Sequence, residues 1–208
     1  MTHNRLHLHG IIGEPEADAR TLGTFLAANA GPVDIVLNSP GGIASEGAAM
    51  LAEIERHGEA TVLIEGIAAS AASLVAMGAR EIVMHRDALM MLHDPSAISI
   101  GTAQTHRDTA DTLEKMTQTY AGAYARASGN SEELVRAWMA AETWLNAEEA
   151  VALNFADRIE GGERTVAMAL GGFDVSMFHN APAQLLEGAR HRGAAEPSEA
   201  GKMESKNA

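Results

Sequence analysis

Several residue types and patterns are scarce in this chain of 208 residues, and each scarcity excludes a class of function. There is no cysteine, which excludes disulfides, thiolate zinc sites and a cysteine nucleophile. With 15 basic and 28 acidic residues, the net charge of −13 argues against binding to nucleic acid or to an anionic membrane surface, because both attract basic residues. No apolar run approaches about 18 residues, and the first ten residues lack the apolar core of a signal peptide. We therefore expect a cytoplasmic protein with no nucleic acid and no membrane as partner.

The remaining composition is that of one ordinary globular domain, with 46% apolar and 21% charged residues. Short runs rich in Val, Ile and Leu predict strands at residues 6–12, 33–37, 61–64, 81–84 and 89–92. Between them, helical patterns cover residues 15–28, 44–56 and 70–77. This alternation predicts an α/β fold with largely parallel strands.

The second half of the chain favours helices. A long helix is expected over residues 102–128, with an apolar outer face that needs a partner. Spacings of three and four residues place on one face Leu113, Met116, Tyr120, Tyr124 and Ala127. Further helices are expected after a cap at Asn130 or Ser131 and after Asn146. Residues 187–208 contain one large apolar side chain and are predicted to be disordered.

A serine stands where a predicted strand gives way to a helix, in the segment GIAASAAS of residues 66–73. Small residues let a substrate backbone approach, and free N–H groups at a helix start favour a developing oxyanion. Ser70 is therefore a candidate nucleophile, although on this segment alone a plain helix cap is the simpler explanation.

Two glycines follow another predicted strand, in the segment NSPGG of residues 38–42. Such a turn leaves bare N–H groups at the carboxyl edge of the sheet, where ligands bind in open α/β folds. The backbone N–H groups of Gly41 and Gly42 can thus donate to an oxyanion, and the turn leaves room for an extended peptide beside it. An ordinary turn is the alternative explanation.

His93 ends an apolar strand just before a proline, and Glu142 precedes an aromatic residue and a helix start. The strand end would place His93 at the same edge as Ser70, where a neutral imidazole can act as a general base. A carboxylate such as Glu142 can orient that imidazole. Taken singly, a buried structural histidine and a solvated glutamate are the simpler explanations.

Taken together, these four segments resemble the ClpP-type serine peptidases of the ClpP/crotonase superfold over residues 5–159. The resemblance rests on NSPGG at 38–42, GIAAS at 66–70, MLHDP at 91–95, and WLNAEEA at 144–150 followed by NFAD at 154–157. It implies a spiral of βαβ units with a long protruding handle helix in residues 1–159, and a partly disordered C-terminal extension in residues 160–208.

The same resemblance implies catalytic roles. The triad would be Ser70, His93 and Glu142, with Gly42 and Ala71 donating backbone N–H groups to the oxyanion. Gly41 and Gly42 would line the substrate strand, and Ser73 would be a structural helix residue. We expect peptidase activity without cofactor or metal.

Three departures from the family pattern bear on assembly and partners. Glu142 replaces the usual Asp, and Ala141 stands where the family commonly has an Arg that supports ring-to-ring pairing. The segment that meets an unfoldase ATPase is not found before the first strand, so an ATPase partner is doubtful. A homo-oligomeric ring of seven subunits is expected, with a stacked double ring as the alternative. Short chains with a loose extension resemble the head maturation proteases of tailed phages, which process scaffold and capsid proteins inside the procapsid.

Other functions stay open. A bacterial ClpP-like housekeeping peptidase and a catalytically inactive ClpP-fold scaffold protein fit the same pattern. A Ser–Lys peptidase is disfavoured because the three lysines are Lys115, Lys202 and Lys206, one in a helix and two in the extension. His7 and His9 share one strand face, where an exposed edge explains them better than a metal site.

Overall fold

The computed structural model of the chain describes residues 3–161, 178–183 and 185. Thirteen helices and strands alternate over these residues, which confirms the predicted α/β class. In chain order they are β1 (Asn4–His9), α1 (Ala19–Ala28), β2 (Val33–Ser39), α2 (Ala44–His57), β3 (Ala60–Ala69), α3 (Ala71–Ala76), β4 (Glu81–His85), β5 (Leu89–Leu92), α4 (Ala103–Ser128), α5 (Glu132–Ala140), β6 (Thr143–Asn146), α6 (Ala147–Ala152) and β7 (Arg158–Glu160).

One sheet carries all seven strands. Its main path runs β1-β2-β3-β4-β7 with every pair parallel, while β5 pairs with β3 in parallel and with β6 in antiparallel fashion. The long strand β3 changes neighbour along its length, since residues 61–64 pair with β4 and residues 67–69 pair with β5. Gly66 makes this change possible: its φ is +92°, and a Cβ there would lie 2.8 Å from Oδ1 of Asn38.

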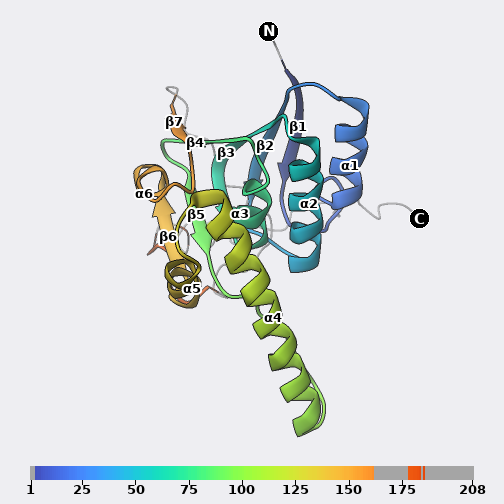
Figure 1. The fold of residues 1–208 in the computed structure, drawn as a ribbon, viewed down its shortest axis with the longest axis vertical. Coiled ribbons are helices and arrows are strands. Elements are labelled where there is room, and N and C mark those ends of the chain that lie inside the picture. Colours follow the sequence, from blue (N-terminus) through green and yellow to red (C-terminus); the bar gives the residue numbers. More distant parts are fainter. Residues whose placement is uncertain (1–2, 162–177, 184, 186–208) are drawn as a thin grey trace, which may run out of the picture.

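The helices cover the sheet, with one exception. α1 and α2 lie side by side next to the strands β1 to β3, and α5 and α6 lie beside β6 (Figure 1). α4 projects from the body as a single long helix. It begins at the outer tip, where the Thr102 hydroxyl caps it, and ends at the body with Gly129 in the left-handed conformation. The expected protruding helix is therefore present.

The boundaries differ from the sequence expectations at three places. β1 spans Asn4–His9 rather than residues 6–12. α1 begins at Ala19 rather than at residue 15, because the Asp18 side chain accepts a hydrogen bond from the Thr21 N–H and Glu16 has a φ of +75°. β3 continues five residues past residue 64, up to Ala69, because β5 supplies a second partner for its end.

Burial along α4 does not extend to the last of the five residues that their spacing places on one face. Ala127 is exposed, and the face continues four residues after Tyr124 to Ser128. The buried residues are Thr117, Tyr120, Ala121, Ala123, Tyr124 and Ser128.

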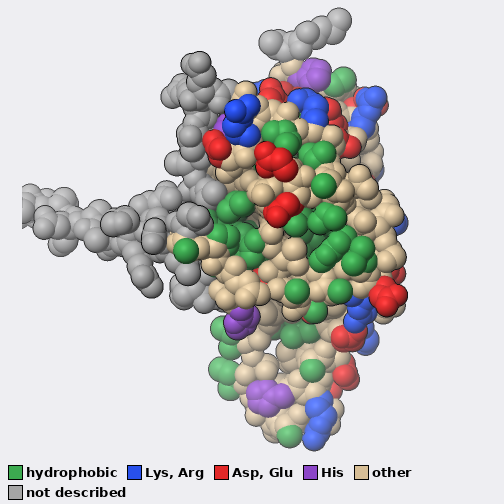
Figure 2. Space-filling view, turned by 90° about the vertical axis from the view of Figure 1, so that its left-hand side faces the viewer, with side chains coloured by type: hydrophobic (Ala, Val, Ile, Leu, Met, Phe, Trp, Pro, Cys, Tyr) green, Lys and Arg blue, Asp and Glu red, His purple; other side chains and the backbone are tan. Residues whose placement is uncertain are grey.

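The outer half of α4 also lacks the apolar face that we expected. Figure 2 shows hydrophobic side chains gathered in the middle of the visible face of the body and only scattered ones on the protruding end. The large exposed apolar side chains of this region precede the helix: Ile98 is 92% exposed and Ile100 is 90% exposed. The prediction of disorder for residues 187–208 lies outside the described residues. Among the helices formed by the described residues, none is both long and apolar enough to cross a membrane.

Candidate active site

Three strand ends meet at one place in the sheet. Ser70 directly follows β3, His93 directly follows β5, and Glu142 directly precedes β6. Ala69 pairs with Met91 in the parallel β3–β5 ladder, and Leu92 pairs with Thr143 in the antiparallel β5–β6 ladder. This register brings together the three side chains that the sequence singled out.

Ser70 and His93 form a close polar pair. The Oγ of Ser70 lies 2.7 Å from Nε2 of His93, which is a strong hydrogen bond between a hydroxyl and an imidazole. Ser70 has φ +55° and ψ −125°, a conformation that costs a non-glycine residue about 1–3 kcal/mol. The Ser70 N–H donates to the Met91 carbonyl at 3.0 Å, and the Ser70 carbonyl accepts from the Leu74 N–H at 3.2 Å. These bonds stabilise a sharp turn that presents the hydroxyl to the imidazole.

Ser73 supports this turn from below. Its side chain is completely buried, with Oγ 2.8 Å from the Ser70 carbonyl oxygen and 2.7 Å from that of Met91. The Tyr124 hydroxyl lies 2.8 Å from the same Oγ, and burial raises the pKa of Tyr124 far above its ordinary value. Ser73 therefore links α3, β5 and α4. It does not line the cavity space next to Ser70, which is described below.

Ser70 and His93 open into a cavity of about 360 Å³. Its other lining residues are Gly42, Ile43, Ala44, Pro95, Ser96 and Phe178. The glycine turn fits closely against the serine, because a Cβ on Gly41 would lie 2.7 Å from both the Ala69 carbonyl oxygen and the Ser70 Cβ. The φ of Gly41, +102°, likewise favours glycine. The N–H groups of Gly42 and Ala71 thus belong to the two segments that border Ser70.

The Glu142 carboxylate is bound by backbone rather than by the histidine. Oε2 accepts from the His179 N–H at 2.8 Å, and Oε1 accepts from the Asn180 N–H at 2.6 Å and from the Trp144 indole at 3.3 Å. Among the described residues, no hydrogen bond joins Glu142 to His93. Burial alone would raise the pKa of Glu142, but these donors and the positive potential of His93 outweigh it and hold the pKa below its usual value.

His93 is poised as a neutral base. Burial lowers its pKa below 6.5, against the opposing effect of the negative charges on Glu142 and Asp94, and His179 adds to the lowering. Glu142 therefore acts on His93 through its charge. The net direction could not be read from the sequence, because burial and the carboxylate act in opposite senses.

Asp94 is a second carboxylate beside the imidazole. Its Oδ1 is buried without a hydrogen-bond partner among the described residues. Burial raises the pKa of Asp94, while Arg136 and His93 oppose the rise. Glu142, with its pKa held low by three donors, is the better supported anion of the two.

The sequence reasoning missed the partners of Glu142. Phe178, His179 and Asn180 fall in the stretch that we predicted to be a C-terminal extension, yet they contact the site directly. Two of these contacts use backbone N–H groups, which no sequence pattern reveals. The sequence offered one hint of these contacts: Phe178 is a large aromatic residue in a stretch with little regular spacing of apolar residues.

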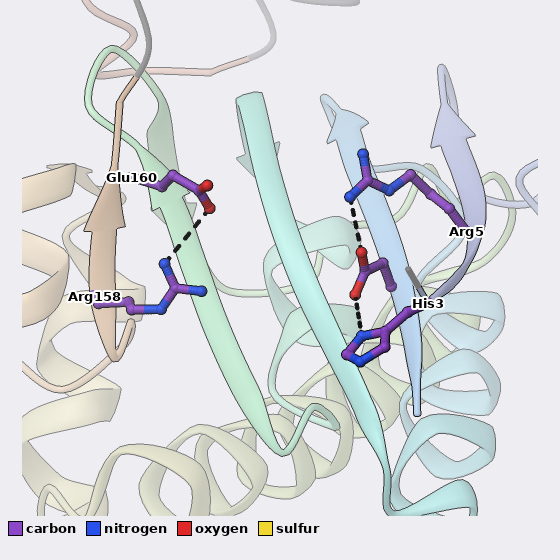
Figure 3. Close-up of polar contacts among 5 residues, drawn as sticks. His3, Arg5, Arg158 and Glu160 are labelled. Carbon is purple, nitrogen blue, oxygen red and sulfur yellow. Dashed lines mark hydrogen bonds and ion pairs between the residues drawn. The ribbon is translucent and has the colours of Figure 1, made fainter. Parts of the chain in front are cut away.

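A larger cavity, about 520 Å³, lies elsewhere on the sheet and shares no lining residue with the cavity at Ser70. It is lined by His3 and by residues of β1 to β4 and β7. Its charged side chains pair with one another: Asp34 with His3 at 3.0 Å and Arg5 at 2.8 Å, and Arg158 with Glu160 at 3.5 Å (Figure 3). Exposed ion pairs of this kind contribute little to stability and carry no nucleophile. The smaller cavity at Ser70 is therefore the candidate active site.

Comparison with known proteins agrees with this assignment of fold and class. A Clp protease family profile matches residues 21–163. The chain is 30% identical over 135 residues to "ATP-dependent Clp protease proteolytic subunit 1" of Chlamydia muridarum, covering 62% of this chain and 69% of the relative. It is 27% identical to the protein of the same name from Protochlamydia amoebophila, covering 62% and 65%.

Among solved structures, a point mutant of ClpP1 from Listeria monocytogenes has the same fold. The TM-score is 0.68 at 20% identity, over 77% of this chain and 92% of the other. The family match spans more than half of the chain and includes all four motifs and the Ser70–His93 pair. The chain belongs to the Clp protease family of serine-type peptidases.

Proposed function

We propose that the protein is a serine endopeptidase that cleaves peptide bonds through Ser70, His93 and Glu142. The observation that carries the proposal is the 2.7 Å contact between Ser70 Oγ and His93 Nε2 at the mouth of a cavity. A nucleophile bonded to a base of lowered pKa is what acyl transfer requires near neutral pH.

The residues have distinct roles in this reaction. Ser70 Oγ attacks the scissile carbonyl carbon while His93 Nε2 takes the hydroxyl proton and then passes it to the leaving amine. The N–H groups of Gly42 and Ala71 stabilise the oxyanion, and the extended substrate lies against Gly41 and Gly42. Glu142 favours the imidazolium through its negative charge. Water repeats the sequence on the acyl-enzyme, so that neither metal nor cofactor takes part.

A fluorophosphonate probe tests the nucleophile. We expect the probe to label the wild-type protein at Ser70 and to leave Ser70→Ala and His93→Ala unlabelled. Ser73→Ala is the matched control and should label like wild type, because Ser73 is buried beneath the turn. Absence of labelling in the wild-type protein would favour the inactive scaffold protein. Labelling of Ser73 would show that the assignment of Ser70 as the nucleophile is wrong.

We propose further that the protein works as a homo-oligomeric ring, with seven subunits as the expected number and a double ring as an option. The exposed Ile98 and Ile100, in the segment that leads into the outer end of the projecting α4, support association with another copy. Sedimentation at micromolar concentration should give a species several times the 21.8 kDa of one chain. A stable monomer contradicts this assembly.

For the biological role, we propose processing of scaffold and capsid proteins during phage head maturation, in the host cytoplasm and inside the procapsid. Ala141 replaces the Arg that commonly supports ring-to-ring pairing in the family. This replacement supports a role that does not depend on a double ring. The names of the curated relatives favour a second candidate, ATP-dependent degradation by a bacterial housekeeping peptidase.

Two assays on the same preparation separate these roles. Head maturation predicts defined cleavage of a capsid or scaffold protein encoded beside this gene, without ATP, in wild type and not in Ser70→Ala. The housekeeping role predicts that an unfoldase ATPase with ATP stimulates degradation of an unfolded protein. Stimulation by the ATPase, with no cleavage of the capsid or scaffold protein, contradicts the phage role.

A further inference from the structure

Two apolar side chains of the C-terminal region, Phe178 and Leu185, pack against β3 and β5 near the candidate active site. Phe178 is 6% exposed and Leu185 is 3% exposed. They join a small apolar cluster, separate from the main core, that includes Ile67, Ala69 and Met91. The burial of Phe178 anchors the residues that follow it, His179 and Asn180, beside β3 and β5.

That backbone binds the Glu142 carboxylate through two consecutive N–H groups, one for each oxygen. His179 donates to Oε2 at 2.8 Å and Asn180 donates to Oε1 at 2.6 Å. The Asn180 side chain also donates to the Ala141 carbonyl at 2.8 Å, which ties the segment to the residue before Glu142. Hydrogen bonds to an ionised carboxylate are the strong ones, and two of them set both the charge and the orientation of Glu142.

The phenyl ring of Phe178 contacts the base itself. Its centroid lies 5.7 Å from that of His93 at an interplanar angle of 90°, and 5.5 Å from the Trp144 ring at 76°. Edge-to-face contacts of this kind favour one ring orientation. Phe178 also lines the cavity at Ser70, so the segment contacts the acid, the base and the substrate space at once.

We propose that residues 178–180 are a positioning element of the catalytic centre: the His179 and Asn180 N–H groups hold Glu142, and the Phe178 ring holds the His93 imidazole. The proposal rests on the proposed function, since it assigns these residues to the reaction at Ser70. The charged and titratable groups that face His93 are Glu142, Asp94 and His179. A weaker hold on Glu142 therefore lowers the pKa of His93 and slows proton transfer.

The test uses a pair of variants in the full chain, Asn180→Pro and Asn180→Ala. Both lose the side-chain bond to Ala141, but only proline removes the backbone N–H. We expect kcat for a fluorogenic peptide to fall at least about tenfold in Asn180→Pro, with KM nearly unchanged, because small misplacements at a catalytic centre cost this much or more. Asn180→Ala should lose clearly less activity than Asn180→Pro, because it keeps the N–H that binds Glu142 and loses only the side-chain bond to the Ala141 carbonyl.

A second readout is the titration of His93, followed by NMR of the imidazole in a Ser70→Ala background and assigned by its loss in His93→Gln. The midpoint should fall by about half a pH unit on adding Asn180→Pro and stay constant on adding Asn180→Ala. A merely structural role would not produce this difference. The titration needs no turnover, so it tests the positioning proposal even if the protein is not a peptidase. Failure of the proposed function would show separately, as absence of probe labelling in the wild-type protein.

Phe178→Leu covers the case in which Asn180→Pro does not fold. Leucine keeps an apolar anchor and removes the ring edge, so we expect kcat to fall about threefold or more with little change in melting temperature. Wild-type kcat and an unchanged His93 titration in either folded variant overturn the proposal. Equal losses in Asn180→Pro and Asn180→Ala also overturn it, since the side chain and not the N–H would then matter.

Discussion

Replacing Ser73 with alanine should weaken the fold while leaving the chemistry nearly intact. Ser73 Oγ is fully buried and lies within 2.8 Å of three oxygens, those of the Ser70 and Met91 carbonyls and the Tyr124 hydroxyl. Ser73→Ala leaves the Tyr124 hydroxyl with the Ser70 carbonyl as its remaining partner at 3.5 Å, too long for a good hydrogen bond. A buried hydroxyl without a good partner costs about 1–3 kcal/mol, and we expect unfolding free energy to fall by that amount.

A double-mutant cycle with Tyr124→Phe isolates the contact. Tyr124→Phe alone should cost about 1 kcal/mol, because Ser73 Oγ keeps its two carbonyl partners. The double variant contains no stranded hydroxyl, so its cost should be smaller than the sum of the single costs by about 1 kcal/mol. Costs that add to within about 0.5 kcal/mol would refute the reasoning.

The assay is denaturant unfolding at one fixed protein concentration, since assembly makes apparent stability depend on concentration. Thr119→Ala is the matched control: its hydroxyl donates to the Lys115 carbonyl on the exposed side of α4, and its loss should be nearly neutral. Well below the unfolding transition, Ser73→Ala should cleave a peptide at close to the wild-type rate.

Three further outcomes follow from the site. Peptidase activity should rise with pH through one ionisation below pH 6.5, because burial lowers the pKa of His93 and the neutral imidazole is the active form. A flat profile from about pH 5 to 9 would exclude His93 as the base. Glu142→Gln should reduce kcat by roughly 10²–10⁴, a smaller loss than in Ser70→Ala. The change removes the negative charge and one of the two carboxylate oxygens that accept from the His179 and Asn180 N–H groups. An unchanged kcat would mean that another residue is the acid. Gly41→Ala should lower activity and cost at least about 1 kcal/mol of stability, since its Cβ would press on Ser70 at a φ of +102°; full activity at wild-type stability contradicts the close packing of the turn.

The sequence by itself determined the fold class and most of its elements. Apolar runs bounded by turn residues located β2, β4 and β5 nearly to the residue, because buried parallel strands are short and continuous in hydrophobicity. The helix starts near residue 131 and after Asn146 were equally local, since a cap side chain bonds to N–H groups two or three residues along; the structure decides for Ser131 over Asn130 as the first cap. Four motifs in family order also predicted which serine, histidine and glutamate come together.

Only the tertiary structure decided how these residues are held. The Ser73–Tyr124 contact joins residues 51 positions apart, and the Glu142 contacts to His179 and Asn180 span 37 and 38 positions. Backbone N–H groups are the same in nearly every residue, so no pattern could mark those of His179 and Asn180 as partners of Glu142. The direction of the His93 pKa likewise depends on how burial balances the nearby carboxylates, and burial is a property of the packed chain.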